Sequence, residues 1–192
     1  QTLLGIVAVV PYFIALAQAS RIREAVALGM LFGATSTALT HYWLMFFGEF
    51  SAWTLGGVTL GYTGYHALLA PIIARFCDVR PPYRSFALAL LWTAYEFLKS
   101  VGFLGFPWGL LAYPVHSVPA LIQHVEVTGI WSLSFLVAVT NAVLFELLHL
   151  RRNPFAARWE YRRIALQAAM AGVLCFVMLG CGWMRRAQPL PR

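Results

Sequence analysis

Charged residues are scarce in this sequence. Only 11% of its 192 residues are Asp, Glu, Lys or Arg, against about 25% in an average soluble domain. Hydrophobic residues make up 60% of the chain, and the mean hydropathy is +0.71. Such a chain would aggregate in water, which excludes an ordinary soluble domain and favours a membrane protein. Its apolar runs are unbroken rather than alternating, which argues against membrane-spanning strands.

Cysteine is rare too, and the sequence has no recognisable catalytic motif. Cys77, Cys175 and Cys181 show neither C-x-x-C spacing nor a histidine at ligand spacing, so we expect small apolar core residues. There is no Gly-x-Ser-x-Gly elbow, no His-Glu-x-x-His pair and no phosphate-binding glycine loop. The sequence therefore predicts no catalytic residue, no metal and no cofactor in this chain.

The apolar residues gather into long segments that predict an all-α membrane protein, a bundle of about six transmembrane helices over residues 1–184. A helix needs about 20 apolar residues to cross a bilayer. Pro11 is expected to kink the first span, and Gly57-x-x-x-Gly61 to form a close packing seam in the third. The fifth is long enough to tilt or to begin with an interfacial turn. The predicted spans are residues 3–19, 25–47, 52–76, 85–99, 120–149 and 164–183.

The cations behind the net charge of +7 are concentrated in three connections between spans, residues 20–24, 75–84 and 150–163. Cytoplasmic loops are enriched in Lys and Arg, so these loops are predicted in the cytoplasm and both chain ends in the periplasm of a bacterial inner membrane. Retention of positively charged loops in the cytoplasm explains the positive net charge better than nucleic-acid binding does. No nucleic-acid partner is therefore expected. The loop cations are Arg21, Arg23, Arg75, Arg80, Arg84, Arg151, Arg152, Arg158, Arg162 and Arg163, against Lys99, Arg185, Arg186 and Arg192 elsewhere.

The residues at the two ends of the chain predict further protein segments before and after it. Gln1 leads directly into an apolar run on the predicted outer side, which usually requires an earlier span or a cleaved signal. Residues 185–192, with Pro189 and Pro191, are predicted to form a linker towards a periplasmic domain outside this chain. We therefore expect a piece of a longer protein, with a naturally short protein as the alternative.

The stretch from Gly102 to Pro114 is apolar and aromatic, yet too rich in glycine and proline for a straight helix. Irregular backbone lies at membrane depth only where it is buried in protein or lines a cavity. We therefore expect a re-entrant or interfacial loop at 101–118 on the outer side, with Gly105 to Trp108 packed against the end of the fourth span. Trp108 and Tyr113 would lie at headgroup depth, and simple interfacial anchoring is the alternative.

One charged pair falls at the end of a predicted span. Glu96 and Lys99 lie three residues apart on one helical face. A carboxylate inside a span is costly, so it is usually paired or functional. We expect either a structural ion pair, with the Lys99 ammonium reaching the outer surface, or part of a functional site.

Five other ionisable residues have simpler interpretations. Glu126 either joins the Glu96–Lys99 pair or is solvated. His41 and His66 are read as core histidines before any proton-relay role. Glu146 and His149 lie at the cytoplasmic end of the fifth span, where a solvated turn is expected.

Three sequence motifs follow one another between residues 92 and 135. They are Trp92…Glu96-Phe97-Leu98-Lys99, Gly105-Phe106-Pro107-Trp108…Tyr113 and Gln123…Gly129-Ile130-Trp131-Ser132-Leu133-Ser134-Phe135. Together they resemble the membrane part of the apolipoprotein N-acyltransferase family, and the helix with Tyr42-Trp43 is also similar. Lys99 stands where the family usually has arginine, which keeps the charge but not bidentate donation, and Ser132 where it often has glycine.

The resemblance implies an enzyme, apolipoprotein N-acyltransferase, of which this chain is the membrane part. In that family a cysteine takes an acyl chain from a phospholipid and passes it to the N-terminal diacylglyceryl-cysteine of an apolipoprotein. The family's Glu, Lys and Cys triad lies in a nitrilase-like periplasmic domain without a counterpart here, so this piece alone is predicted inactive. The implied partners are phospholipid, apolipoprotein and membrane lipid, with other membrane subunits left open. The implied substrate- or lipid-binding residues are Glu96, Lys99, Phe106, Pro107, Trp108, Tyr113 and Gln123.

Two other classes of function stay open. A non-catalytic scaffold subunit built from the same bundle would explain a short chain. A small transporter would use Glu96, His41 and His66 along its pathway, but no inverted repeat supports it.

Overall fold

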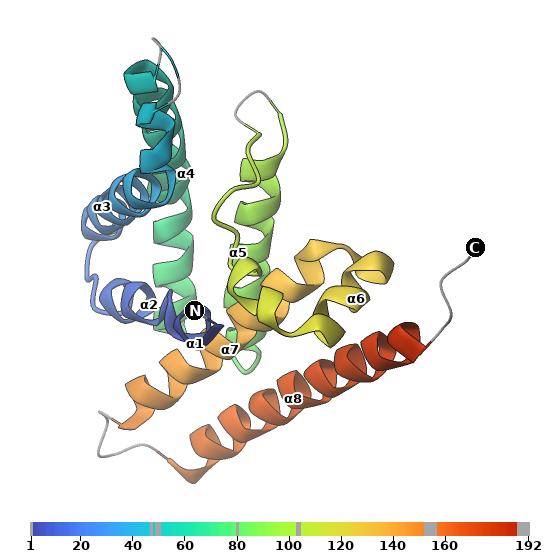
Figure 1. Cartoon of the computed structure of the whole chain (residues 1–192). Coiled ribbons are helices and arrows are strands. Elements are labelled where there is room, and N and C mark those ends of the chain that lie inside the picture. Colours follow the sequence, from blue (N-terminus) through green and yellow to red (C-terminus); the bar gives the residue numbers. More distant parts are fainter. Residues whose placement is uncertain are drawn as a thin grey trace. The chain divides into compact units, whose positions relative to one another are not determined.

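The computed structural model of the chain describes residues 2–46, 48, 51–79, 81–102, 105–151 and 157–187. Every regular element in these ranges is a helix, which confirms the all-α prediction (Figure 1). Of the predicted linker at 185–192, residues 188–192 lie outside the described residues, as do Arg80, Arg152 and Phe103. The elements are α1 (Thr2–Val7), α2 (Val10–Leu16), α3 (Ile22–His41), the 3-10 helix η1 (Tyr42–Phe46), α4 (Ser51–Val79), α5 (Arg84–Ser100), the 3-10 helix η2 (Tyr113–Ser117), α6 (Pro119–Thr128), α7 (Ile130–Arg151) and α8 (Arg158–Ala187).

The chain forms two compact units. The first, here called the α3–α4 unit, comprises residues 12–81 and 94–110, and the second, the α6–α8 unit, comprises residues 1–11, 82–93 and 111–192. Helix α5 runs through both, because its first half belongs to the α6–α8 unit and its second half to the α3–α4 unit.

Helices α3 and α4 pack closely through glycines of α3. A Cβ atom at Gly29 would overlap the carbonyl oxygen of His66, and one at Gly33 would lie 3.0 Å from the His66 Cβ. Around Gly57, by contrast, no atom lies within 4 Å of where a Cβ would be, and the residue is exposed. At Gly57 the predicted close packing is therefore not found, because small-residue spacing alone does not tell which helix or face makes the close approach.

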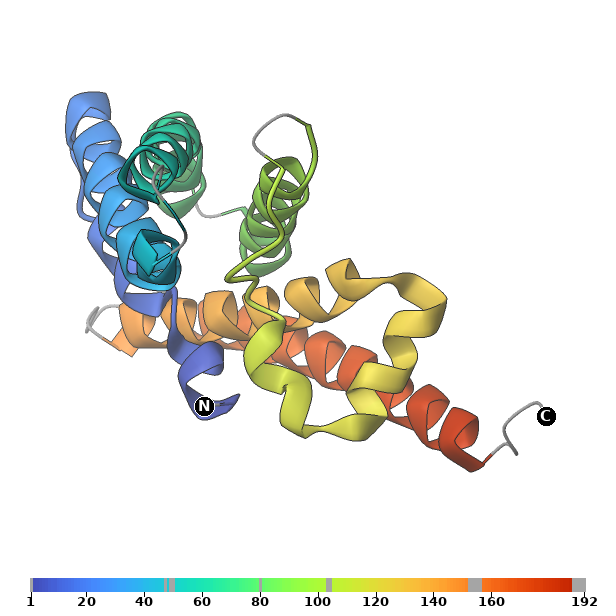
Figure 2. The same ribbon diagram turned by 45° about the horizontal axis from the view of Figure 1, so that its top comes forward.

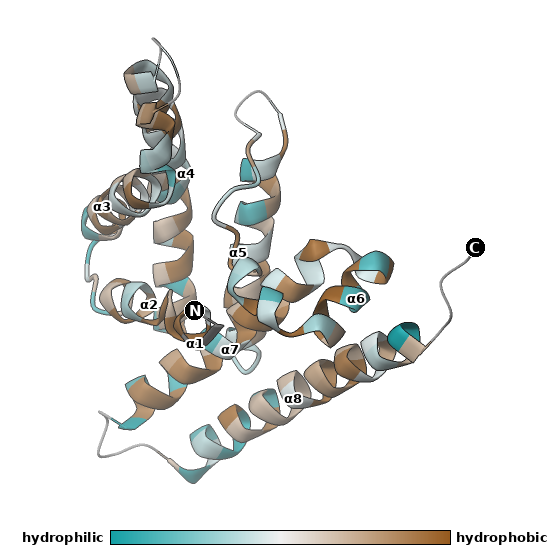
Figure 3. Ribbon diagram, viewed as in Figure 1, coloured by the Kyte–Doolittle hydropathy of each residue, from teal (hydrophilic) through white to brown (hydrophobic). Residues whose placement is uncertain are grey.

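The α6–α8 unit holds the two described helices that are long and apolar enough, by length and composition, to cross a membrane. These are α7 and α8. Figure 3 shows α8 hydrophobic along its middle and hydrophilic at both ends. Helix α6 packs on α8, where Gly182 lets the backbone of Ala120 come into direct contact (Figure 2). The other predicted spans coincide with α1–α2, α3, α4 and α5, and their membrane crossing stays a prediction.

The first predicted span is two helices rather than one kinked helix. The chain turns between α1 and α2 just before Pro11, whose nitrogen has no hydrogen to donate. Such a break needs neighbours that satisfy the freed backbone groups. Asn141 of α7 does this: its Oδ1 accepts from the N–H of Val9 at 3.1 Å, and its Nδ2 donates to the carbonyl of Gly5 at 2.9 Å.

The fifth predicted span, residues 120–149, is also divided. Helix α6 ends at Thr128 and α7 begins at Ile130. Gly129 between them has φ of 73°, which side-chain-bearing residues rarely adopt. The apolar composition continues across this position, so hydropathy alone gave one long span where a single glycine makes two helices.

Candidate functional site

Lys99 lies in the last turn of α5, buried against aromatic side chains of the α3–α4 unit. Its Nζ donates to the backbone carbonyl of Trp108 at 2.9 Å and lies 3.4 Å from that of Gly109. The same ammonium is 5.7 Å from the ring centre of Tyr62 and 5.6 Å from that of Tyr95. Only 5% of Lys99 is exposed, so its charge is stabilised by carbonyl dipoles and aromatic faces rather than by water.

The segment after α5 folds back onto the end of that helix. The N–H of Phe106 donates to the carbonyl oxygen of Lys99 at 3.0 Å, and the N–H of Gly105 to that of Gly102 at 2.9 Å. The hydroxyl of Tyr62 lies 3.1 Å from the Phe106 carbonyl oxygen and 3.3 Å from that of Lys99, so one proton is shared between the two. The prediction that Gly105 to Trp108 is not helical and packs on the end of the fourth predicted span is confirmed, and its place at the outer face of a membrane stays a prediction.

The two aromatic side chains of this loop contact the end of α3 and η1. Trp108 lies 5.1 Å from Trp43 and 6.2 Å from Phe106, measured between ring centres. Phe106 is also 6.1 Å from Trp43 and 5.8 Å from His41. Trp108 nonetheless stays 47% exposed. The loop therefore leaves about half of Trp108 exposed while contacts with Trp43 and Phe106 hold its ring.

Two further predicted residues, Glu96 and Pro107, belong to the same unit as Lys99. Glu96, one turn earlier in α5, is 1% exposed, and its carboxylate attracts the Lys99 ammonium electrostatically. Pro107 is exposed between Phe106 and Trp108. The structure thus brings Glu96, Lys99, Phe106, Pro107 and Trp108 into one unit.

Tyr113 and Gln123 belong instead to the α6–α8 unit. Tyr113 begins η2 and is 39% exposed, and Gln123 is exposed on α6. Their part in a common site with Lys99 stays a prediction. Glu126, three residues after Gln123, pairs with Arg185 of α8 at 2.6 Å.

Sequence reasoning missed Trp43, which contacts Phe106 and Trp108 of the loop, and Tyr62, which contacts Lys99. The cluster His41-Tyr42-Trp43 is visible as an aromatic run, but one sequence does not reveal what it contacts. Tyr62 looks like any other aromatic residue of an apolar helix. Its role depends on a hydrogen bond to a residue 44 positions later.

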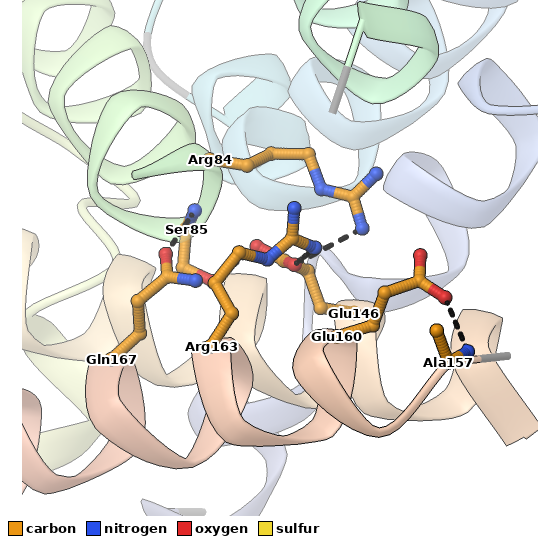
Figure 4. Close-up of polar contacts among 7 residues, drawn as sticks. All are labelled: Arg84, Ser85, Glu146, Ala157, Glu160, Arg163 and Gln167. Carbon is orange, nitrogen blue, oxygen red and sulfur yellow. Dashed lines mark hydrogen bonds and ion pairs between the residues drawn. The ribbon is translucent and has the colours of Figure 1, made fainter. Parts of the chain in front are cut away.

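Glu146 is the clearest correction, because it is fully buried rather than part of a solvated turn. Its Oε2 accepts from Arg84 at 3.1 Å and from Arg163 at 2.8 Å, and its Oε1 accepts from Ser85 at 2.6 Å (Figure 4). Gln167 adds a 2.9 Å bond from the backbone N–H of Ser85. The available signal was Glu146 itself, since a carboxylate within an apolar helix requires partners.

The chemistry open to these two clusters is binding and positioning. At Lys99 the ammonium hydrogens point at carbonyl oxygens, and at Glu146 the carboxylate is shared between two guanidinium groups. Within the described ranges, no three His, Cys, Asp or Glu side chains converge in a way that could hold a metal ion. In the first cluster, Pro107 and Trp108 are exposed and can contact another molecule.

Comparison with known proteins gives one family. The family model described as the apolipoprotein N-acyltransferase N-terminal domain matches residues 1–143. Apolipoprotein N-acyltransferase 2 of Treponema pallidum is 36% identical over 148 residues, which are 77% of this chain and 26% of that protein. The apolipoprotein N-acyltransferase of Borreliella burgdorferi is 31% identical over 148 residues, 77% of this chain and 28% of the relative.

A longer match is found in Geobacter metallireducens, whose apolipoprotein N-acyltransferase is 29% identical over 175 residues, 87% of this chain and 33% of that protein. The chain therefore spans about a quarter to a third of the length of these curated relatives. No solved structure matches it.

Proposed function

This chain belongs to the apolipoprotein N-acyltransferase family, and we propose that it is the membrane part of an enzyme that transfers an acyl chain from a phospholipid to an apolipoprotein. The acceptor is the α-amine of an N-terminal diacylglyceryl-cysteine. In this proposal the reacting cysteine lies outside this chain, which spans about a quarter to a third of the length of its curated relatives.

The proposed reaction has two steps. The cysteine thiolate attacks the ester carbonyl of the phospholipid, the bond to the glycerol oxygen breaks, and that oxygen takes a proton as lysophospholipid leaves. The acceptor amine then attacks the thioester carbonyl, the carbon–sulfur bond breaks, an amide forms, and the amine's proton returns to the thiolate. An acyl-enzyme divides one difficult transfer into two easier ones.

The loop at Lys99 is the observation that supports this function most directly. Gly105 to Trp108 is held by main-chain and side-chain bonds to the end of α5, so Trp108 is presented on a fixed backbone. A rigid, half-exposed indole is suited to contact the apolar chain and the headgroup region of a lipid at once. In this proposal the loop lies beneath the catalytic domain and guides the acyl donor.

The proposed placement is a multi-pass protein of the bacterial inner membrane with about six spans. The loops at 20–24, 75–84 and 150–163 face the cytoplasm, and both chain ends and the Lys99 loop face the periplasm. Arg84 and Arg163 are two of the loop cations that support this orientation, but both pair with the carboxylate of Glu146. The cytoplasmic placement of the loops therefore rests mainly on the other loop arginines.

A test uses the whole natural protein in phospholipid vesicles with a labelled acyl chain and a diacylglyceryl-cysteine peptide. The wild type should transfer label to the peptide amine, and Trp108→Ala should lower kcat/KM about tenfold, equivalent to about 1.4 kcal/mol. Trp53→Ala is the matched control, because Trp53 is 82% exposed on α4 of the same unit, and it should leave the rate unchanged. Absence of transfer by the wild type would contradict the proposal and favour the non-catalytic scaffold.

A further inference from the structure

The α6–α8 unit contains an apolar cavity of about 370 Å³ that is separate from the residues of the Lys99 site. Helices α1, η2, α6, α7 and α8 all contribute to its walls. Leu121 and Leu136 lie at its buried side, and Ala168, Gly172 and Cys175 line it along α8.

Water is a poor occupant of this cavity. Its lining is aliphatic apart from Thr140 and Cys175, and the Thr140 hydroxyl already donates to the Leu136 carbonyl at 2.9 Å. A buried water needs about two to four polar partners, and an apolar cavity of about 150 Å³ is large enough to stay dry and bind benzene. A space more than twice that size, left empty, would forfeit many dispersion contacts.

The cavity also has an opening towards a surface that is apolar. Ala168 and Gly172 are exposed on α8, and no atom lies within 4 Å of where a Cβ of Gly172 would be. Helix α8 is one of the two helices apolar and long enough to cross a membrane. When α8 spans a bilayer, the opening at Gly172 faces hydrocarbon, and a flexible chain can enter from the side.

We propose that this cavity holds one acyl chain of a membrane phospholipid, bound as a resident structural lipid that the reaction does not consume. A single chain matches the cavity in polarity, and the missing side chain at Gly172 leaves the passage for it. The proposal rests on the membrane placement of α7 and α8 in the proposed function, but not on acyl transfer. Lipid binding and transfer are therefore tested by separate measurements.

The experiment uses the whole protein in vesicles of phosphatidylethanolamine that carries a photoactivatable diazirine midway along one acyl chain. After illumination, the cross-linked residues are mapped by mass spectrometry. In the wild type, cross-links should fall on the cavity walls of α7 and α8. Gly172→Leu should fill the opening and reduce them at least fivefold, and Ala168→Leu, one turn earlier, should act in the same direction.

Gly180→Leu is the matched control. Gly180 lies on the same helix, is exposed, has no atom within 4 Å of its Cβ position and does not line the cavity. Its cross-links should equal those of the wild type. Equal labelling of the cavity walls in all four proteins would overturn the proposal. So would a wild type whose cavity walls cross-link to a second copy or another polypeptide helix and not to lipid. Acyl transfer, measured in parallel, reports the proposed function independently.

Discussion

The backbone N–H of Phe106 donates a 3.0 Å hydrogen bond to the carbonyl oxygen of Lys99. The side chain of Lys99 also binds the loop, because its Nζ donates to the carbonyl of Trp108 at 2.9 Å. One residue at the end of α5 thus holds the loop through its main chain and its side chain. The conformation of the loop depends on the ammonium as well as on the backbone.

Replacing Lys99 by methionine should loosen this loop. Lys99→Met keeps an unbranched apolar stem but removes the ammonium that donates to the part-buried carbonyl of Trp108, and a hydrogen bond to a charged group contributes about 1.5–3 kcal/mol. We expect amide hydrogen exchange across residues 105–110 to accelerate by about tenfold or more. Lys99→Arg retains a cation and donors and should stay close to the wild type. Equal exchange in Lys99→Met and the wild type would show that the side chain does not hold the loop.

A methyl group at Gly105 should displace the same loop by a different route. The Cβ of Gly105→Ala would lie 2.7 Å from the carbonyl oxygen of Gly102 and 2.8 Å from the carbonyl carbon of Val101, and neither backbone atom can move independently. The substitution should reduce acyl transfer by the whole protein with little change in helix content. Gly57→Ala, in open space on α4, should be neutral or stabilise by up to about 1 kcal/mol because alanine favours helix. Full activity of Gly105→Ala would contradict the observed loop geometry.

How the fold relates to the sequence is seen best at this loop. Its non-helical backbone follows from Gly102, Gly105 and Pro107, residues that are unfavourable in a helix interior. That it meets Lys99 also follows, because a short loop after α5 has few other surfaces to contact. That Trp43 and Tyr62 complete the cluster does not follow, since both contacts join residues more than 40 positions apart.

The buried polar residues mark the limit of prediction from hydropathy. Asn141 looks like a tolerated polar residue in an apolar helix, yet its side chain hydrogen-bonds the backbone groups left free at the break between α1 and α2. Glu146 was assigned to a solvated turn because of its place near the end of a span. Which arginines meet it depends on how α5, α7 and α8 converge within their unit, and a charge count along the chain holds no such information.

Neutralising Glu146 should destabilise the α6–α8 unit strongly. Glu146→Gln leaves two buried guanidinium groups without their counter-ion, and breaking a buried pair in this way costs about 3–5 kcal/mol. We expect a clear fall in the midpoint of thermal unfolding in detergent, followed by circular dichroism. Glu126→Gln is the matched control, because its ion pair with Arg185 is 60% and 41% exposed and is worth about 1 kcal/mol or less.

A triple replacement tests whether the buried charges around Glu146 themselves stabilise the unit or only need to be paired. Glu146→Leu with Arg84→Met and Arg163→Met removes every charge of the cluster, and such apolar replacements are often neutral or stabilising. It should recover most of the stability lost in Glu146→Gln. A triple variant less stable than Glu146→Gln would mean that the charges themselves stabilise the unit.

The orientation in the membrane can be tested at three exposed positions of the described chain. In the whole protein carrying Cys77→Ser, Cys175→Ser and Cys181→Ser, one new cysteine is introduced at Ser20, Ser117 or Ala157, each of which is exposed. Cells with a permeabilised outer membrane are treated with a membrane-impermeant maleimide, and the parent without a new cysteine sets the background.

Ser117→Cys should be labelled in these cells, because the loop at 101–118 is predicted on the periplasmic side. Ser20→Cys and Ala157→Cys should be labelled only after the inner membrane is broken, because the arginines around them favour retention in the cytoplasm. Ala157 decides the matter most sharply: it precedes α8, and the connection at 150–163 holds five of the 14 cations, Arg151, Arg152, Arg158, Arg162 and Arg163. Labelling of Ala157→Cys before the inner membrane is broken would reverse the orientation of α8 and place the Glu146 cluster on the periplasmic side.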